Sequence, residues 1–228
     1  LTTEQLVGLS TQQIAALDAS DLAGLTAVKL AALTTAQVVA LETDDFAAFG
    51  STQVGGLTTD QVKVLGTEDI AAFSTTQVAG FTTAQLAVFS TQQLRALSVA
   101  DYAAFSTTQL RAFDTTQLQA LSTAAIEGLS STQVAALTSA QLIALTTQQV
   151  GAIEAADLSA LTTANLSRLL EDQVRALTTA QVAALSSTQV VGLTTAQFAA
   201  LTTQAIAGMS STQVAALTTA QLAALTTA

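Results

Sequence analysis

Residues 178–193 read TTAQVAAL SSTQVVGL, and residues 218–225 read TTAQLAAL. The same eight-residue unit fills the chain from Thr2 to Leu225 as 28 consecutive octads, without an insertion or a deletion. The fifth and eighth positions are large and apolar in every octad, and the fourth position is Gln in 19 of the 28. A repeat of this kind decides the whole fold, because each unit must adopt a conformation that its neighbours share.

A single continuous helix does not fit this repeat. Eight residues at about 100° each advance roughly 800°, so an apolar stripe would rotate by about 80° in every octad. A coiled coil is excluded for the same reason, since its seam needs about 3.5 or 3.67 residues per turn. A β-solenoid is disfavoured because positions five and eight would face opposite sides of a strand, and because Ala and Gln are poor strand formers. One short helix in each octad remains.

Each octad carries its own helix start signal. Ser or Thr at position one and Gln at position four form a capping box, as in Thr2/Gln5, Ser10/Gln13, Thr34/Gln37 and Ser74/Gln77. The next capping residue ends the helix after about six or seven residues, and helices that short are unstable alone in water. Burying two apolar anchors releases about 3 to 6 kcal/mol, against about 8 to 16 kcal/mol for ordering eight residues. We therefore predict an all-α solenoid (superhelix) of 28 short capped helices, one per octapeptide, completed by stacked neighbours.

The other positions predict how these helices pack. Position seven is Ala or Gly in 25 octads, with Val64, Val88 and Arg168 as exceptions, and it lies almost opposite position five on a helix. A position exposed to water would not have to stay small, so we expect it to touch a neighbouring helix or turn closely. Positions three and six vary and carry charges, and we expect them to be solvated.

A fainter rhythm with a period of three octads concerns the acidic side chains at position four. Asp21, Asp45 and Asp69 recur at every third octad, whereas Asp101 and Asp157 break the series. Three octads per superhelical turn would explain the rhythm, and two or four helices per turn stay open as alternatives. Residues 1–228 are expected to be a single octapeptide-repeat α-solenoid. The repeat opens and closes in mid-unit without polar capping repeats, so we interpret the chain as a segment of a longer array.

The composition excludes several classes of function. The chain has no His, Cys, Trp or Pro, so His-based acid–base chemistry, thiol nucleophiles, disulfides and Cys/His zinc sites are excluded. The net charge of −10, with only six Lys and Arg, argues against binding nucleic acid or an anionic membrane. No apolar run approaches the roughly 18 residues that span a bilayer, so we predict no membrane insertion. The first residues also lack the basic start and apolar core of a targeting signal.

Several residue groups could be read as sites, but each has a simpler structural explanation. Three acidic groups resemble calcium ligands or paired carboxylates for glycoside hydrolysis: Asp18/Asp21, Glu42/Asp44/Asp45 and Glu68/Asp69. A variant helix cap explains them better, because a carboxylate at position four can still accept from the cap amide. The Phe residues and Tyr102 occupy core positions five and eight, and the hydroxyl residues have no general base. Leu170 replaces a capping hydroxyl, and we expect it to continue the preceding helix. We therefore predict no enzyme activity, no cofactor, and no catalytic, cofactor-binding or metal-binding residue.

Two octads carry a resemblance to known proteins. Residues 34–41 read TTAQVVAL and residues 130–137 read SSTQVAAL. They resemble the Thr-Thr-x-Gln octapeptide tracts of very large, repetitive bacterial proteins of the secreted or surface adhesin-like type. The likeness covers the entire chain. It implies an extracellular or cell-surface location, and it supplies no catalytic residues.

The leading functional expectation is structural. It is a spacer or stalk of fixed pitch, or a self-assembling filament or surface-layer segment. Its partners would be neighbouring repeats or further copies of the chain, and no nucleic acid. The alternative is a binding surface for ice or a cell-surface ligand, made of hydroxyl pairs that recur at every third octad: Thr34/Thr35, Thr58/Thr59 and Thr82/Thr83.

Overall fold

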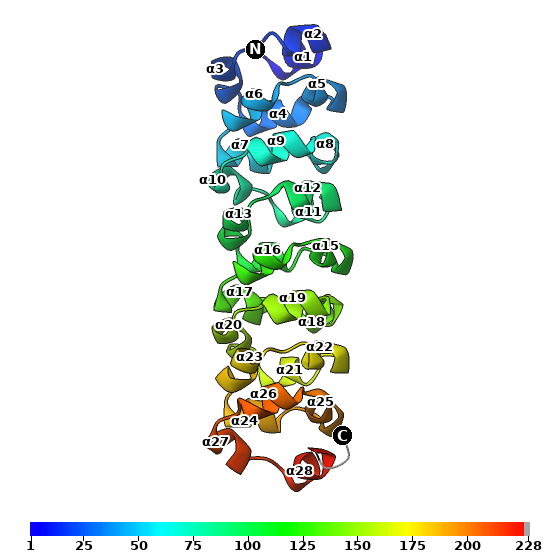
Figure 1. The fold of residues 1–228 in the computed structure, drawn as a ribbon. Coiled ribbons are helices and arrows are strands. Elements are labelled where there is room, and N and C mark those ends of the chain that lie inside the picture. The colour runs from blue at the N-terminus through cyan, green and yellow to red at the C-terminus, as the bar shows by residue number, and fades with distance from the viewer. Residues whose placement is uncertain (226–228) are drawn as a thin grey trace. The chain divides into compact units, whose positions relative to one another are not determined.

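The computed structural model describes residues 1–225, and its contacts divide the chain into two compact units. Unit 1 is Leu1–Ala120 and unit 2 is Leu121–Ala228. Within the described residues each unit consists of short helices joined by tight turns, and neither contains a strand (Figure 1). The predicted all-α solenoid of 28 short helices, one per octad, is confirmed for residues 1–225. The prediction of a single domain over residues 1–228 stays a prediction.

The helices of unit 1 have the following bounds: α1 (Thr3–Val7), α2 (Thr11–Ile14), α3 (Ala19–Ala23), α4 (Ala27–Ala32), α5 (Thr35–Val39), α6 (Thr43–Ala47), α7 (Ser51–Gly56), α8 (Thr59–Val64), α9 (Thr67–Ala72), α10 (Thr75–Val78), α11 (Thr83–Leu86), α12 (Thr91–Ala96), α13 (Val99–Ala104), α14 (Thr107–Leu110) and α15 (Thr115–Gln119). Those of unit 2 are α16 (Thr123–Glu127), α17 (Ser131–Ala136), α18 (Ser139–Ala144), α19 (Thr147–Ala152), α20 (Ala155–Ser159), α21 (Thr163–Leu166), α22 (Glu171–Arg175), α23 (Thr179–Ala184), α24 (Ser187–Val191), α25 (Thr195–Ala200), α26 (Thr203–Ala207), α27 (Ser211–Ala215) and α28 (Thr219–Leu225).

The helices start as the capping boxes predict. In α5 the Thr34 hydroxyl accepts from the Gln37 N–H at 3.2 Å, and the Gln37 Oε1 accepts from the Thr34 N–H at 2.9 Å. The same reciprocal pair occurs at Thr2/Gln5, Ser10/Gln13 and Ser74/Gln77. Most helices are shorter than the predicted length, because the residues around positions six to eight tighten into i to i+3 bonds before the next cap.

The expectation for Leu170 was wrong. Leu170 leaves helical geometry, with φ −70° and ψ 153°, and it precedes α22 as a cap residue without a capping side chain. Its N–H is still satisfied, because it donates to the Gln173 Oε1 at 2.8 Å. The Gln half of the capping box therefore suffices to start a helix where the hydroxyl half is missing.

Within each unit the helices stack with three per superhelical turn. Helices separated by two others pack against each other, as α1 does on α4, α4 on α7 and α7 on α10 in unit 1. Unit 2 repeats the relation, with α22 on α25 and α25 on α28. This confirms three octads per turn and rules out two or four within each unit. The fainter rhythm of the sequence has the same period of three octads, so it follows the superhelical turn.

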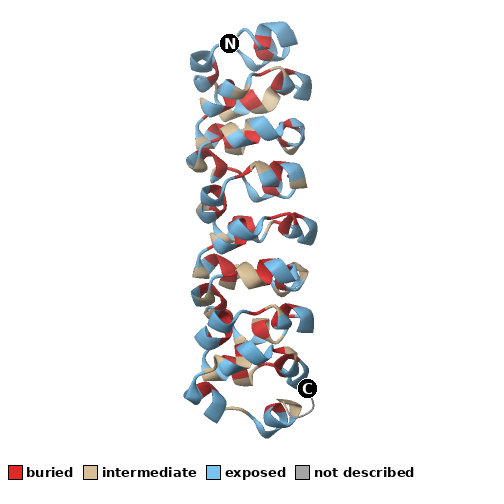
Figure 2. Cartoon of the chain, viewed as in Figure 1, coloured by how far each residue is buried: buried red, intermediate tan, exposed pale blue. Residues whose placement is uncertain are grey.

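Positions five and eight form the core of each unit. Leu94, Val134 and Leu158 at position five are fully buried, and buried residues recur in successive helices (Figure 2). In unit 1 the aromatic residues pack edge-to-face across successive octads, with ring centroids 5.5 Å apart for Phe73 and Phe81 and 5.0 Å apart for Phe81 and Phe89. The prediction that the Phe residues and Tyr102 are core residues is confirmed for Phe46, Phe49, Phe73, Phe81, Phe89, Phe105, Phe113 and Tyr102.

The small residue at position seven packs against the start of a helix one turn earlier. A Cβ built on Gly56 of α7 would lie 2.4 Å from the Cβ of Ala27 in α4. A Cβ on Gly80 of α10 would likewise lie 2.6 Å from the carbonyl oxygen of Ser51 in α7. The predicted close contact at position seven is therefore confirmed at these octads. It sets how near two stacked helices can approach.

We expect Gly56→Ala to destabilise unit 1 by about 1 to 3 kcal/mol, because the new methyl group overlaps Ala27 and forces α4 and α7 apart. Gly24→Ala is the matched control at the same octad position, since its Cβ would meet only carbonyls of its own helix, at 3.4 Å or more. There the lower chain entropy of Ala should make the change neutral or mildly stabilising. Chemical denaturation of both variants measures the difference, and equal effects would show that the contact at position seven is not specific.

Candidate functional surfaces

The glutamine at position four makes a second set of hydrogen bonds that capping does not require. Gln61 is 1% exposed, and its Oε1 accepts from the Thr58 N–H at 2.8 Å as the capping box predicts. Its Nε2 donates to the carbonyl of Leu30 at 2.8 Å and to that of Leu33 at 2.7 Å. Both acceptors belong to the octad four units earlier, at its positions five and eight. One side chain thus starts its own helix and ties it to the end of a helix in the preceding turn.

We call this contact, from the Gln Nε2 at position four to carbonyls of the octad four units earlier, the inter-turn amide bond. It recurs through both units with N–O distances of 2.5 to 3.5 Å. Among the residues that make it are Gln37, Gln53, Gln61, Gln77, Gln85, Gln93, Gln109 and Gln117 in unit 1, and Gln149, Gln173, Gln181, Gln189, Gln197, Gln213 and Gln221 in unit 2.

Sequence reasoning missed the inter-turn amide bond, although one signal pointed to it. Glu serves a capping box as well as Gln does, yet Glu never occurs at position four in the 28 octads. A carboxylate would supply the acceptor for the cap amide but no donor for the carbonyls. The preference for Gln over Glu at this position fits a role for the Nε2 donor, although Asp holds the position in five octads without supplying one.

Aspartate at position four uses its oxygens differently. The Asp69 carboxylate accepts from the Gly66 N–H at 2.9 Å, which confirms the predicted variant cap. Its other oxygen accepts from the hydroxyl of Thr43 at 2.9 Å, in the helix one turn earlier. Asp157 likewise accepts from the Ser131 hydroxyl at 2.5 Å. At Asp69 and Asp157 the octad thus keeps a polar contact to the previous turn, but it supplies no amide for the carbonyls four octads back.

The three acidic groups of the sequence lie on one stack of unit 1. They belong to α3, α6 and α9, or to the residue that caps each of these helices, and α6 packs on both α3 and α9. The Ser20 hydroxyl and the Asp21 N–H hold the pKa of the Asp18 carboxyl below its ordinary value. Among residues 1–225 no group of three or more carboxylates is arranged to hold a metal ion.

We expect neither calcium nor a chelator to change the melting temperature of the chain by more than about 1 °C. A bound ion would raise the melting temperature with concentration, because it would bind the folded state alone. Circular dichroism melts in millimolar CaCl₂ and in EDTA measure this, with NaCl of equal ionic strength as the control for screening of the α3–α6–α9 carboxylates. A calcium-dependent rise of many degrees would place an ion site on this stack.

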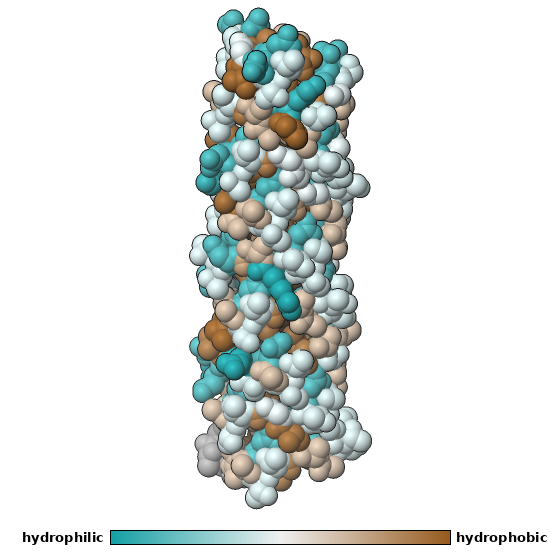
Figure 3. All heavy atoms as spheres, turned by 180° about the vertical axis from the view of Figure 1, so that it is seen from behind, coloured by the Kyte–Doolittle hydropathy of each residue, from teal (hydrophilic) through white to brown (hydrophobic). Residues whose placement is uncertain are grey.

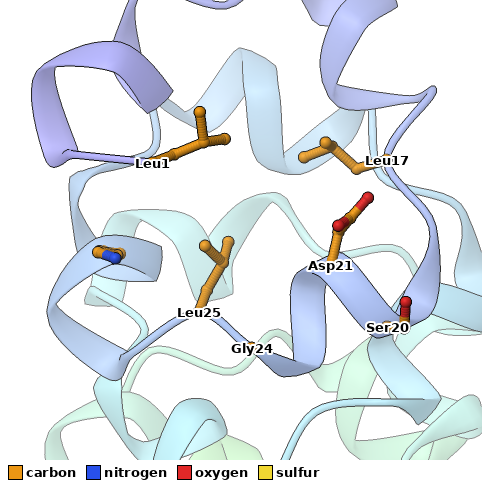
Figure 4. Close-up of a pocket in the computed structure, with 7 residues that line it drawn as sticks. Leu1, Leu17, Ser20, Asp21, Gly24 and Leu25 are labelled. Atoms are coloured by element: carbon orange, nitrogen blue, oxygen red, sulfur yellow. The ribbon is translucent and has the colours of Figure 1, made fainter.

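A cavity opens at the first turn of unit 1 (Figure 4). Leu1, Leu17 and Leu25 lie around it, with Asp21 and Ser20 at one side. Leu17 and Leu25 hold position eight, and they are partly exposed here, whereas the same position is 4% exposed at Leu33 in the next octad. The cavity is therefore an uncovered part of the repeat core rather than a set of converging polar groups.

The predicted hydroxyl pairs lie in one column of unit 1. They stand at the starts of α5, α8 and α11, which stack in that order. The first member of each pair, such as Thr58, accepts from the amide of its own octad, at 3.2 Å from Gln61 N–H. The second members Thr35 and Thr83 are exposed, and Thr59 is half-buried.

The surface is weakly polar and carries few charges. In the view of Figure 3 pale residues predominate, with separate hydrophilic and hydrophobic ones scattered among them. The charged residues at position six, Lys63, Arg95, Arg111, Glu127 and Arg175, are all exposed, which confirms that position as solvated for these octads. Within residues 1–225 no helix has the length and apolar character needed to cross a membrane.

Comparison with known proteins identifies the repeat. No curated protein matches the chain. The model of the ALTTAQ repeat family matches it eight times, at residues 14–47, 38–74, 62–99, 89–123, 111–147, 150–195, 171–203 and 190–227. Each match spans several octads, and together they extend over nearly all of the helices described above. The chain belongs to the ALTTAQ repeat family.

Proposed function

We propose that the chain is a structural repeat module that serves as an extracellular spacer or stalk, or as a segment of a self-assembling filament or surface layer. The observation that carries the proposal is that one pattern of contacts recurs along each unit. Every inter-turn amide bond joins an octad to the one four units earlier, and helices pack on the third helix along. The length and stability of such a fold depend on the number of repeats, and its contacts are not concentrated at one localised site.

Two further features support a structural role. The buried polar side chains, mainly those at position four, form helix caps and inter-turn contacts. Among residues 1–225 no buried side-chain polar atom lacks a hydrogen-bond partner. The resemblance to Thr-Thr-x-Gln tracts of bacterial adhesin-like proteins supports the extracellular or cell-surface location. We propose on the same grounds that the chain has no enzymatic role.

The dependence of length on repeat number tests the proposal. The chain contains no Cys, so Glu4→Cys and Ala220→Cys, both at exposed positions, allow two fluorophores to be attached at defined sites. Variants lacking three or six octads between the labels should shorten the donor–acceptor distance by equal increments, because each removes whole turns. A distance that is broadly distributed, or that does not change in steps, would contradict a spacer. Sedimentation velocity of the unlabelled chain separates a monomeric spacer from a self-assembling segment.

The threonine column of unit 1 favours a second candidate, binding of ice or of a cell-surface ligand. Thr35, Thr59 and Thr83 are available for this because the caps use the first threonine of each pair. Changing these three residues to Val should leave the helix caps in place while removing a regular hydroxyl array. Thermal hysteresis of the chain that is lost in the triple variant would support ice binding, and no hysteresis in either protein would dismiss it.

A further inference from the structure

The inter-turn amide bonds are unevenly distributed in unit 2. The turn made by α22, α23 and α24 is tied to the helices before it by three glutamines, Gln173, Gln181 and Gln189. The turn made by α19, α20 and α21 has only one, Gln149, whose Nε2 donates to the Leu121 carbonyl at 2.9 Å. In the other two octads of that turn, position four is Asp157 in α20 and Asn165 in α21.

Neither replacement supplies the missing amide. The Asp157 carboxylate is an acceptor, so the carbonyls of Ile126 and Leu129 receive no side-chain donor from it. Asn165 is one methylene shorter than Gln, and its side chain makes no hydrogen bond within the described residues. The carbonyls of Val134 and Leu137 therefore lack the inter-turn amide bond too, although Leu137 is only 3% exposed.

The helices at this joint are also weakened in other ways. The cap of α20 is Glu154, which makes no side-chain capping bond. α21 is four residues long and lacks a reciprocal capping box, because Asn165 does not reach the Thr162 N–H. α21 packs on α24 but makes at most sparse contact with α18. Every other pair of helices in unit 2 with two helices between them packs closely.

We propose that the joint between the α16–α18 turn and the α19–α21 turn is a built-in yield point, at which unit 2 opens first. Opening there breaks two inter-turn amide bonds, those of Gln149 and Gln173. Opening at the next joint would break four, those of Gln173, Gln181, Gln189 and Gln197. Opening at the yield point exposes apolar side chains that are fully buried when the joint is closed, Leu158 and Leu166 among them. Local opening of this kind occurs in the elements of a fold that have the fewest stabilising contacts, and it needs less free energy than global unfolding. The proposal concerns the fold alone and does not depend on the spacer function.

Native-state hydrogen exchange of the whole chain tests the yield point. The helical amides of Leu158 and Leu166 donate to Glu154 and Thr162 carbonyls, and they report on α20 and α21. We expect them to exchange about tenfold or more faster than the equivalent amides of Val182 and Val190 in α23 and α24. Equal protection at the two places would overturn the proposal.

Two variants separate the missing bonds from other causes. The double variant Asp157→Gln with Asn165→Gln should restore both inter-turn amide bonds and slow exchange at Leu158 and Leu166 by about tenfold. The single variant Asn165→Gln restores one of the two bonds and keeps the contact between Asp157 and Ser131. The matched control, Gln181→Asp with Gln189→Asn, should create fast exchange at Val182 and Val190 instead. If the restored variant folds and exchanges as the parent does, the joint is not set by these two residues and the proposal fails.

Discussion

Removal of residues 182–185 is expected to abolish the cooperative unfolding of unit 2, whereas removal of Thr178–Leu201 leaves that transition in place. The shorter deletion takes out Val182 and Leu185, which are 0% and 3% exposed, and with them both anchors of one octad. It also removes the carbonyls that accept from the Gln213 Nε2 at 2.9 and 2.7 Å. In a turn that has lost half an octad, a helix can no longer pack against the helix three positions earlier in the chain. The loss should reach about 5 kcal/mol or more, since each buried anchor alone is worth about 2 to 5 kcal/mol.

The deletion of three whole octads removes far more chain but keeps the repeat intact. It takes out α23, α24 and α25, one whole turn, so α20 and α26 can stack as α20 and α23 do now. Thermal melts followed by circular dichroism in the far ultraviolet compare the two deletions with the parent. A half-octad deletion that melts like the three-octad one would show that stability does not depend on closing turns of three octads.

Gln61→Ala is expected to destabilise unit 1 by about 2 to 4 kcal/mol. The change leaves the Leu30 and Leu33 carbonyls without their donor and the Thr58 N–H without its acceptor. Leu30 and Leu33 are 0% and 4% exposed, so water does not readily replace the lost amide, and each buried unsatisfied group costs about 1 to 3 kcal/mol. Urea denaturation of the variant gives the change in unfolding free energy.

Gln13→Ala is the matched control, because Gln13 is exposed and only caps its own helix. Its Oε1 accepts from the Ser10 N–H at 2.9 Å, and its Nε2 has no partner within the described residues. Loss of a cap contact of this kind costs about 0.5 to 1 kcal/mol. If both variants lose the same amount, the position-four glutamine acts through capping alone and the inter-turn amide bond contributes nothing.

Tyr102 shows how a core residue can contribute a polar contact as well. Its hydroxyl donates to the Leu94 carbonyl at 2.5 Å, and burial raises the pKa of that hydroxyl, so it stays protonated as a donor. Leu94 holds position five, the same carbonyl position that inter-turn amide bonds serve elsewhere. Placing Tyr102 in the core from its octad position was correct, but its acceptor could be identified only in the folded chain.

Most of the local structure was determined by the sequence itself. The caps at Thr34 and Ser74, the buried fifth and eighth positions and the small seventh position all follow from contacts within one octad or from steric limits on its neighbours. These interactions are short in sequence, so an eight-residue pattern contains them. The acidic variant cap at Asp69 was predictable for the same reason.

The tertiary structure alone decided which octads meet. The fainter rhythm of the sequence left two, three or four helices per turn open, and only the packing of α4 on α1 and α7 selected three. The Nε2 of Gln61 has acceptors 28 and 31 residues away, so its role could not be inferred before that number was known. An octad determines which bonds it can offer, whereas the closure of the turn determines which carbonyls lie within reach, because hydrogen bonds form only over about 3 Å in space however far apart the residues are in sequence.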